Sequence, residues 1–205
     1  MTQATVTSRT IAVEHIKISS KHSFEEVRQK LEGTLPKYDR NIAAALRNGD
    51  VKSAKDYEEN GPTLSIVAAV DHGADLQIVG RKRNALLYEI GNPLTATKMT
   101  RHQLPAALYA PLRVVLFEDE QGRGVFEYDK PSSFFAQYGD ERVTEEGRRS
   151  DADLEAAFVT LPNRAASGLK SCSAAACCRV LCYLLSEVLQ HGPAAPRSRR
   201  LLERE

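Results

Sequence analysis

The sequence predicts an α+β fold, and three observations carry this expectation. Residues Thr10–Ile18 are rich in β-branched side chains, which is typical of a strand. Ser23 and Glu26 then form a capping box, followed by apolar residues at helical spacing. Farther along, Ala85–Asp129 holds a strand, a Gly-Asn-Pro turn, a short polar helix and two strands joined by a hairpin. No internal repeat is visible.

Composition excludes several classes of protein. The 205 residues suffice for one domain with extensions, and 42% hydrophobic content with a formal charge of +1 indicates a globular chain. Such a balance argues against nucleic acid as a main partner, because phosphate binding needs clustered Lys and Arg. The first ten residues have no apolar core, and the most apolar segment, 174–189, is short and interrupted by Arg179. We therefore expect a soluble, cytoplasmic protein with no membrane partner.

The C-terminal part differs from the rest. Residues 161–205 carry seven Lys and Arg against three Asp and Glu, and they hold all four cysteines. We expect a flexible N-terminus at 1–9, a single α+β domain at 10–160, and a Cys-, Ala- and Arg-rich tail with one helix at 161–205. Deleting 162–205 should leave a folded body, because 1–160 contains the periodic core elements.

The elements of the first half follow from periodicity and turn residues. The alternation of Thr10–Ile18 slips, which suggests a bulge near Glu14-His15 or burial of both faces. The helix from Ser23 ends at Pro36, and 38–61 reads as an insert of two short helices. Thr63–Val70 is expected to be a strand buried on both faces. Residues 75–80 fit either a short strand or a helical turn.

The second half continues the pattern. Asn92 and Pro93 open a helix that ends near Leu104-Pro105. The other expected elements are a strand at Ala85–Ile90, a central strand at Leu112–Phe117, a turn at Glu120–Gly122, a strand at Val125–Tyr128, a helix from Pro131 and a helix at about Ser150–Leu161.

Over about residues 10–160 the chain resembles the Domain of Unknown Function 302 family. The matching segments are Val70-Asp71-His72, Gly91-Asn92-Pro93 with Thr97 and Met99, Pro111-Leu112 with Glu118-Asp119, and Tyr128-Asp129-Lys130-Pro131. The resemblance implies a TATA-binding-protein-like layout: one antiparallel sheet with helices on one face, in β-α-β4-α-like order, often as a dimer. It implies no established activity. The insert at 38–61 and the Cys-rich tail depart from the family's usual pattern.

Asp71 and His72 are the best acid–base candidates. A carboxylate beside an imidazole can orient the ring and raise its basicity. Adjacent residues on a strand point to opposite faces, however. Asp71 capping the following turn, with His72 in a half-buried slot, is the structural alternative.

Further candidates are polar residues around the next strand and helix. Glu89 would need a partner such as Arg113 or Arg101 if its face is covered, although a solvated outer face is the more common case. The helix start at Asn92 offers free N–H groups to a carboxylate or phosphate, and Thr95, Thr97, Arg101 and His102 could add donors. Every helix has such an end, so a purely structural role is the alternative.

The cysteines give little support for a metal. Cys172, Cys177, Cys178 and Cys182 lack the C-x2-C pairs of common zinc sites, and small apolar residues on a helix are the simpler interpretation. No motif for nucleotide binding or serine hydrolysis is present. We expect no metal and no cofactor.

Two functions remain open. The first is a ligand-binding or assembly module with Asp71, His72, Asn92, Thr97, Arg101 and His102 near the mouth of a mostly apolar pocket. The second is a cofactor-independent lyase, isomerase or hydrolase for a small organic acid, with His72 as base, Asp71 as its orienter and Arg101 as carboxylate clamp. Both require His72 and Asn92 to meet at one edge of the sheet, around a small anionic or phenolic ligand. The exposed edge of Thr10–Ile18 also predicts a homodimer.

Overall fold

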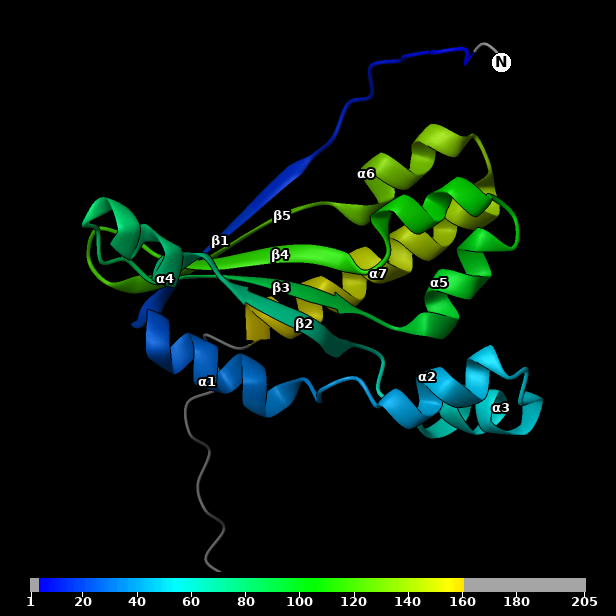
Figure 1. The fold of residues 1–205 in the computed structure, drawn as a ribbon, viewed down its shortest axis with the longest axis horizontal. Helices are drawn as coiled ribbons and strands as arrows, with labels where there is room; N and C mark the ends of the chain where they lie inside the picture. Colours follow the sequence, from blue (N-terminus) through cyan, green and yellow to red (C-terminus); the bar gives the residue numbers. More distant parts are fainter. Residues whose placement is uncertain (1–3, 161–205) are drawn as a thin grey trace, which may run out of the picture. The chain divides into compact units, whose positions relative to one another are not determined.

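A five-stranded antiparallel sheet organises residues 4–160, the part of the chain that this computed structural model describes (Figure 1). The strands lie in the order β1-β5-β4-β3-β2, and every neighbouring pair is antiparallel. Their bounds are β1 His15–Ser23, β2 Ser65–Asp71, β3 Ala85–Gly91, β4 Leu112–Glu118 and β5 Arg123–Asp129. This arrangement confirms the predicted α+β fold with one antiparallel sheet, and β4 is the central strand as expected.

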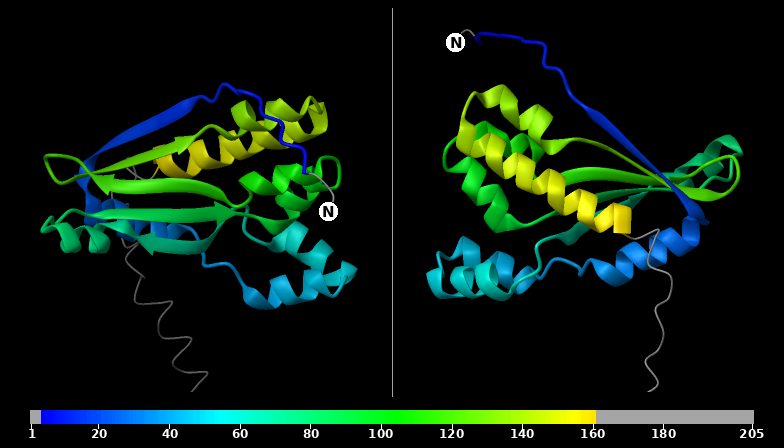
Figure 2. Two further views of the ribbon diagram at one scale, coloured as in Figure 1. Left: turned by 45° about the horizontal axis from the view of Figure 1, so that its top comes forward. Right: turned by 180° about the vertical axis from the view of Figure 1, so that it is seen from behind.

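Helices connect these strands and follow the last one. They are α1 Phe24–Thr34, α2 Arg40–Arg47, α3 Val51–Asn60, α4 His72–Asp75, η1 Leu76–Val79, α5 Pro93–Thr100, η2 Leu104–Tyr109, α6 Pro131–Phe135, η3 Ala136–Tyr138 and α7 Glu141–Thr160. Apolar residues of α1 and α7 join one core cluster with the same face of the sheet, and Figure 2 shows α7 lying across the strands. Helices therefore cover one face, as the fold class requires.

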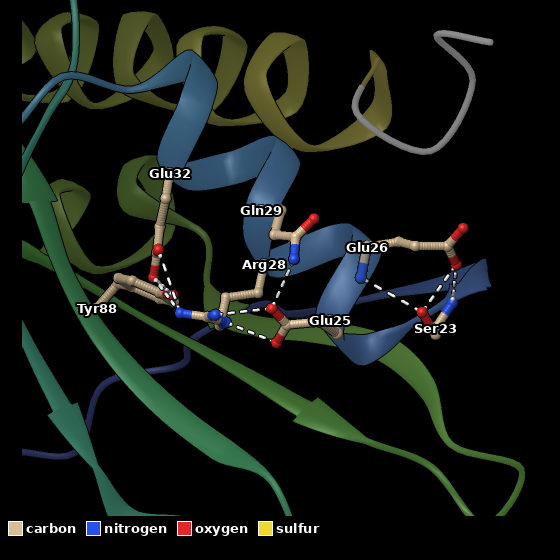
Figure 3. A network of polar contacts seen from close by, with 7 residues as sticks. All are labelled: Ser23, Glu25, Glu26, Arg28, Gln29, Glu32 and Tyr88. Carbon is tan, nitrogen blue, oxygen red and sulfur yellow. Dashed lines mark hydrogen bonds and ion pairs between the residues drawn. The ribbon is translucent and has the colours of Figure 1, made fainter. Parts of the chain in front are cut away.

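Helix α1 is fixed to the sheet by its cap and by one polar network (Figure 3). The predicted capping box is present: the Glu26 N–H donates to Ser23 Oγ at 3.3 Å, and the Ser23 N–H donates to Glu26 Oε2 at 2.9 Å. The Tyr88 hydroxyl of β3 donates to Glu32 at 2.8 Å. Burial, followed by this hydrogen bond, raises the pKa of Tyr88 above its ordinary value. The hydrogen bond between Tyr88 and Glu32 thus joins α1 to β3 on the face of the sheet that α1 covers.

Two strands differ from their predicted form. β1 begins at His15, five residues later than expected, and its irregularity lies between Ser19 and Ser23 rather than near Glu14-His15. Ile11 packs instead against a second core cluster outside the sheet, which explains why the alternation slipped. β2 was expected to be buried on both faces but is an edge strand with Val70 44% exposed. The run of apolar residues in β2 is typical of a central strand, which is buried on both faces. That β2 lies at the edge of the sheet follows only from the order of the strands.

The helices also differ at their ends. Residues 72–79 are helical, which resolves the open alternative at 75–80. The insert forms α2 and α3 as predicted, capped by Asp39 and Asp50. α7 begins at Glu141, nine residues before the expected Ser150. Its first turns carry one buried apolar residue, Val143, rather than an apolar stripe, and charged pairs such as Arg148 with Glu145 at 2.9 Å add to their stability.

A second core cluster lies at the end of the sheet where β3 stops. Its buried members are Met99, Ala106, Phe134, Phe135 and Val143. Gly147 lets α7 approach α6 closely, because a Cβ there would lie 2.9 Å from the Ser132 Cα. α5, η2, α6 and α7 therefore meet at this end, and the site described below lies among them.

The predicted tail helix, the four cysteines and the domain boundary near residue 161 lie outside the described residues. Within residues 4–160, no helix combines the length and apolar character needed to cross a membrane.

Candidate functional site

The two strand ends that were expected to form one site lie at opposite ends of the sheet. Asp71 of β2 is paired with Leu86 of β3, whereas Gly91 of β3 is paired with Ser65. The five steps from Leu86 to Gly91 span about 17 Å at roughly 3.3 Å per residue. Figure 1 shows the same separation, with α4 at one end of the strands and α5 at the other. Neighbouring antiparallel strands run in opposite directions, so the residues that follow β2 and the residues that follow β3 lie at opposite ends of the sheet. The prediction that His72 and Asn92 meet is therefore wrong.

The Asp71–His72 pair does not form an acid–base couple. The Asp71 carboxylate accepts the Ala74 N–H at 2.9 Å and so caps α4, which was the structural alternative. His72 Nδ1 lies 3.9 Å from Asp75, and the His72 side chain is 54% exposed. The proposed base thus faces solvent at the end of the sheet away from Asn92 and Arg101.

Glu89 and Arg113 lie on the face of the sheet opposite α1 and α7. They are directly opposed in the pairing of β3 with β4. Leu86, Tyr88 and Ile90 alternate with Glu89 and join the core on the other side. Glu89 therefore occupies the outer face, as its alternative interpretation held. Neither Glu89 nor Arg113 lines the apolar cavity beside α5 that is described below.

Arg101 and His102 meet each other at a different surface. Arg101 Nε donates to His102 Nε2 at 3.2 Å. The two line an open cleft of about 370 Å³ together with Lys98, Arg142, Glu145, Glu146 and Arg149. Thr97 is exposed and donates its hydroxyl to the Pro93 carbonyl at 2.9 Å. Thr97, Arg101 and His102 therefore lie along or directly after α5, as predicted. None of them lines the apolar pocket beside α5 that is described next.

A mostly apolar cavity lies beside the start of α5. We call this cavity of about 210 Å³ the α5 pocket. It is lined by Tyr38, Thr63, Leu64, Val67, Gly91, Asn92, Pro93, Thr95, Ala96, Met99, Tyr109, Ala110, Pro111, Leu112, Ser150 and Asp153. Most of these side chains are apolar or aromatic, and only a few present polar atoms, which is the usual composition of a small-molecule site.

Asn92 and Thr95 are the residues named from the sequence that line this pocket, and the Asn92 side chain is already used. Its Oδ1 accepts the Leu94 N–H at 2.8 Å, and its Nδ2 donates to the Pro62 carbonyl at 3.0 Å. The N-cap role expected from the Asn-Pro sequence is confirmed. Asn92 therefore shapes the rim of the pocket and ties the entry of β2 to the start of α5.

Asp153 gives the pocket its electrostatic character. Within residues 4–160, its carboxylate makes no hydrogen bond or ion pair, although it is only partly exposed. Burial, and secondarily the nearby charge of Glu146, raises the pKa of Asp153. Ser150, one turn earlier, is buried and donates its hydroxyl to the Glu146 carbonyl at 2.9 Å. A carboxylate in this position would be stabilised by a donor from a ligand.

Several pocket residues were not named as site candidates from the sequence, although Met99 belongs to one of the matching segments. Tyr38 is the first residue of the insert and precedes α2, Met99 and Tyr109 follow the Asn-Pro turn, and Asp153 belongs to α7. One signal was available in the sequence: Asp153 precedes Leu154 on a stripe that also contains Ser150 and Phe158, so a carboxylate borders the core face of the helix. Within the part of the chain described, no group of three His, Cys, Asp or Glu could hold a metal ion.

Comparison with known proteins identifies the family. A solved structure, an uncharacterized conserved DUF302 protein from Bacillus stearothermophilus, is 15% identical, with a TM-score of 0.49 over 73% of this chain and 96% of that one. No curated protein matches the sequence. A family model described as Domain of unknown function DUF302 matches residues 56–161, which confirms the resemblance noted in the sequence. Because this match spans more than half of the 205 residues, the chain belongs to the DUF302 family.

Proposed function

We propose that this protein is a small-ligand-binding module whose site is the α5 pocket. The observation that carries the proposal is a formed, mostly apolar cavity with one unpartnered carboxylate on its wall, within the described residues. Apolar walls favour the transfer of apolar ligand surface out of water, and a few fixed polar groups supply orientation.

The size of the pocket sets the size of the ligand. Its volume is about 210 Å³, whereas an apolar cavity of about 150 Å³ can hold a benzene molecule. A ligand with one ring and a short substituent therefore fits. Such a small apolar surface supports a modest affinity, in the range of micromolar to millimolar dissociation constants.

A thermal-shift experiment with toluene tests the site. A ligand that binds only the folded state raises the melting temperature. Toluene should raise the melting temperature of the full-length protein and should have no effect on Ala96→Phe, because Ala96 lines the pocket and a phenyl group there occupies it. Ala152→Phe is the matched control, since Ala152 is exposed on α7 and does not line the pocket. No shift with the native chain, or an equal shift with Ala96→Phe, would contradict the proposal.

We also propose that two copies of the chain associate along β1. At the other edge of the sheet, Pro36 and Tyr38 hydrogen-bond to Ile66 at 2.9 Å and so cover the start of β2. β1 has no comparable cover among the described residues, and nine residues of edge strand remain available for pairing. Light scattering at tens of micromolar should give the mass of a homodimer; a monomer mass at that concentration contradicts association through a standard-sized interface.

A further inference from the structure

The α5 pocket contains an acidic group and no basic one among its described lining residues. Among the lining residues that the structure describes, Asp153 is the single acidic side chain, and none is Lys, Arg or His. A cationic cluster that includes Arg101 and Arg149 lines the separate cleft beside α5 and α7. The charge of Asp153 is therefore not neutralised by the pocket itself.

Two aromatic rings complete the same wall. Tyr38 and Tyr109 both line the pocket. The Tyr109 ring is held in place, because it stacks on Phe134 with centroids 4.6 Å apart and its hydroxyl accepts a hydrogen bond from Gln137 at 3.0 Å. The faces of tyrosine rings attract cations through their quadrupole. A carboxylate and aromatic rings around an apolar space are typical surroundings of an organic ammonium group.

The start of α5 offers little to an anion. Its first helical residue, Pro93, has no N–H, and the Leu94 N–H is taken by Asn92 Oδ1 at 2.8 Å. An anionic ligand would also approach Asp153 without a compensating cation in the pocket wall. The sequence analysis expected a small anionic or phenolic ligand, and of these two the anion is the one that the pocket wall favours least.

We propose that the α5 pocket selects small apolar amines, with the protonated amine bound to Asp153 and the hydrocarbon or ring held between Tyr38, Met99 and Tyr109. This selectivity rests on the proposed function of the pocket. The ammonium group supplies the donor that Asp153 lacks, and the carboxylate provides the counter-charge that an amine needs when it leaves water.

A matched series of one-ring probes tests the selectivity. Benzylamine, benzyl alcohol and benzoate differ chiefly in the charge of the substituent, and their dissociation constants can be measured by calorimetry at pH 7 with the full-length protein. We expect benzylamine to bind about tenfold to a hundredfold more tightly than benzyl alcohol, since a hydrogen bond to a charged group contributes at that level. Benzoate should bind most weakly.

Asp153→Asn assigns the preference to this carboxylate. The variant should lose the advantage of benzylamine and keep the affinity for benzyl alcohol, whereas Glu155→Gln, which removes one exposed acidic group from the same helix, should behave like the native chain. Melting curves of both variants report that they are folded. Equal binding of benzylamine and benzyl alcohol, tighter binding of benzoate, or an unchanged preference in Asp153→Asn would overturn the selectivity and leave the pocket as a ligand site. Failure of toluene and of all three probes to bind would overturn the proposed function as well.

Discussion

The two ends of the β2–β3 pair show how differently the same kinds of residue can be used. At the end where β2 stops, Asp71 and His72 form the start of α4, and their polar atoms are satisfied locally or face solvent. At the end where β3 stops, α5, η2 and α7 border an apolar cavity whose carboxylate has no partner among residues 4–160. The comparison teaches that adjacent acid and base residues in sequence are weaker evidence for a site than one acid that the fold leaves unpaired.

The largest effect is expected from glycine substitutions at the α4 end. Gly73 is buried, and a Cβ there would lie 2.8 Å from the Ala85 backbone nitrogen and against the Arg83 carbonyl oxygen. Gly73→Ala should lower the free energy of unfolding by about 3 kcal/mol, because backbone must move to admit the methyl group. Gly80→Ala should cost about 1 kcal/mol, since Gly80 has a φ of +69° and open space around it. Urea denaturation measures both, and equal costs would show that the α4 end adapts freely.

An apolar pair sharpens the comparison between the two ends. Met99 is 3% exposed and Ile78, in η1, is 89% exposed. Met99→Ala should lower the free energy of unfolding by about 2 kcal/mol through lost burial and should enlarge the α5 pocket. Ile78→Ala should change it by less than about 0.5 kcal/mol. Denaturation curves that showed a larger loss for Ile78→Ala would reverse the assignment of the packed and open ends.

Asp153 should affect stability in a pH-dependent way. Its pKa is raised in the folded chain by burial and then by Glu146, so ionisation of Asp153 favours the unfolded state. Below about pH 4, the ordinary pKa of an aspartate, the group is protonated in both states and Asp153→Asn should match the native chain. As the pH rises through and above the folded pKa, the variant should become the more stable of the two. Thermal melts between pH 3 and 8 give the difference in stability between the native chain and Asp153→Asn. If the native chain became more stable relative to the variant as the pH rises, the interpretation of Asp153 as a buried carboxylate without a partner among the described residues would be contradicted.

The smallest effect is expected for the residue that the sequence favoured most. His72→Ala should leave the free energy of unfolding within about 0.5 kcal/mol of the native value, because the side chain is 54% exposed and its contact with Asp75 is 3.9 Å long. It should also leave the toluene shift unchanged. A lost ligand response in this variant would return His72 to the binding site.

Much of the fold could be predicted because the signals for it are local. The Ser23–Glu26 capping box, the Asn92 cap and the alternation along β3 depend on residues a few positions apart, and all three were found as expected. The site could not be predicted in this way, because strand register decides which ends meet. The exposed edge position of β2 and the entry of Asp153 into the pocket wall both follow from contacts between distant segments.

The double role of the Asn92 amide has a kinetic consequence. One side chain caps the first turn of α5 through Oδ1 and holds the carbonyl of Pro62, before β2, through Nδ2, so these two parts of the rim cannot separate without losing the hydrogen bond between Asn92 and Pro62. A rim tied in this way is preorganised, so little conformational entropy of the rim is lost when a ligand binds. Association should therefore follow a single fast phase that is proportional to ligand concentration. In Asn92→Ala the rim would be freed, and a slower, concentration-independent step of closure would be added.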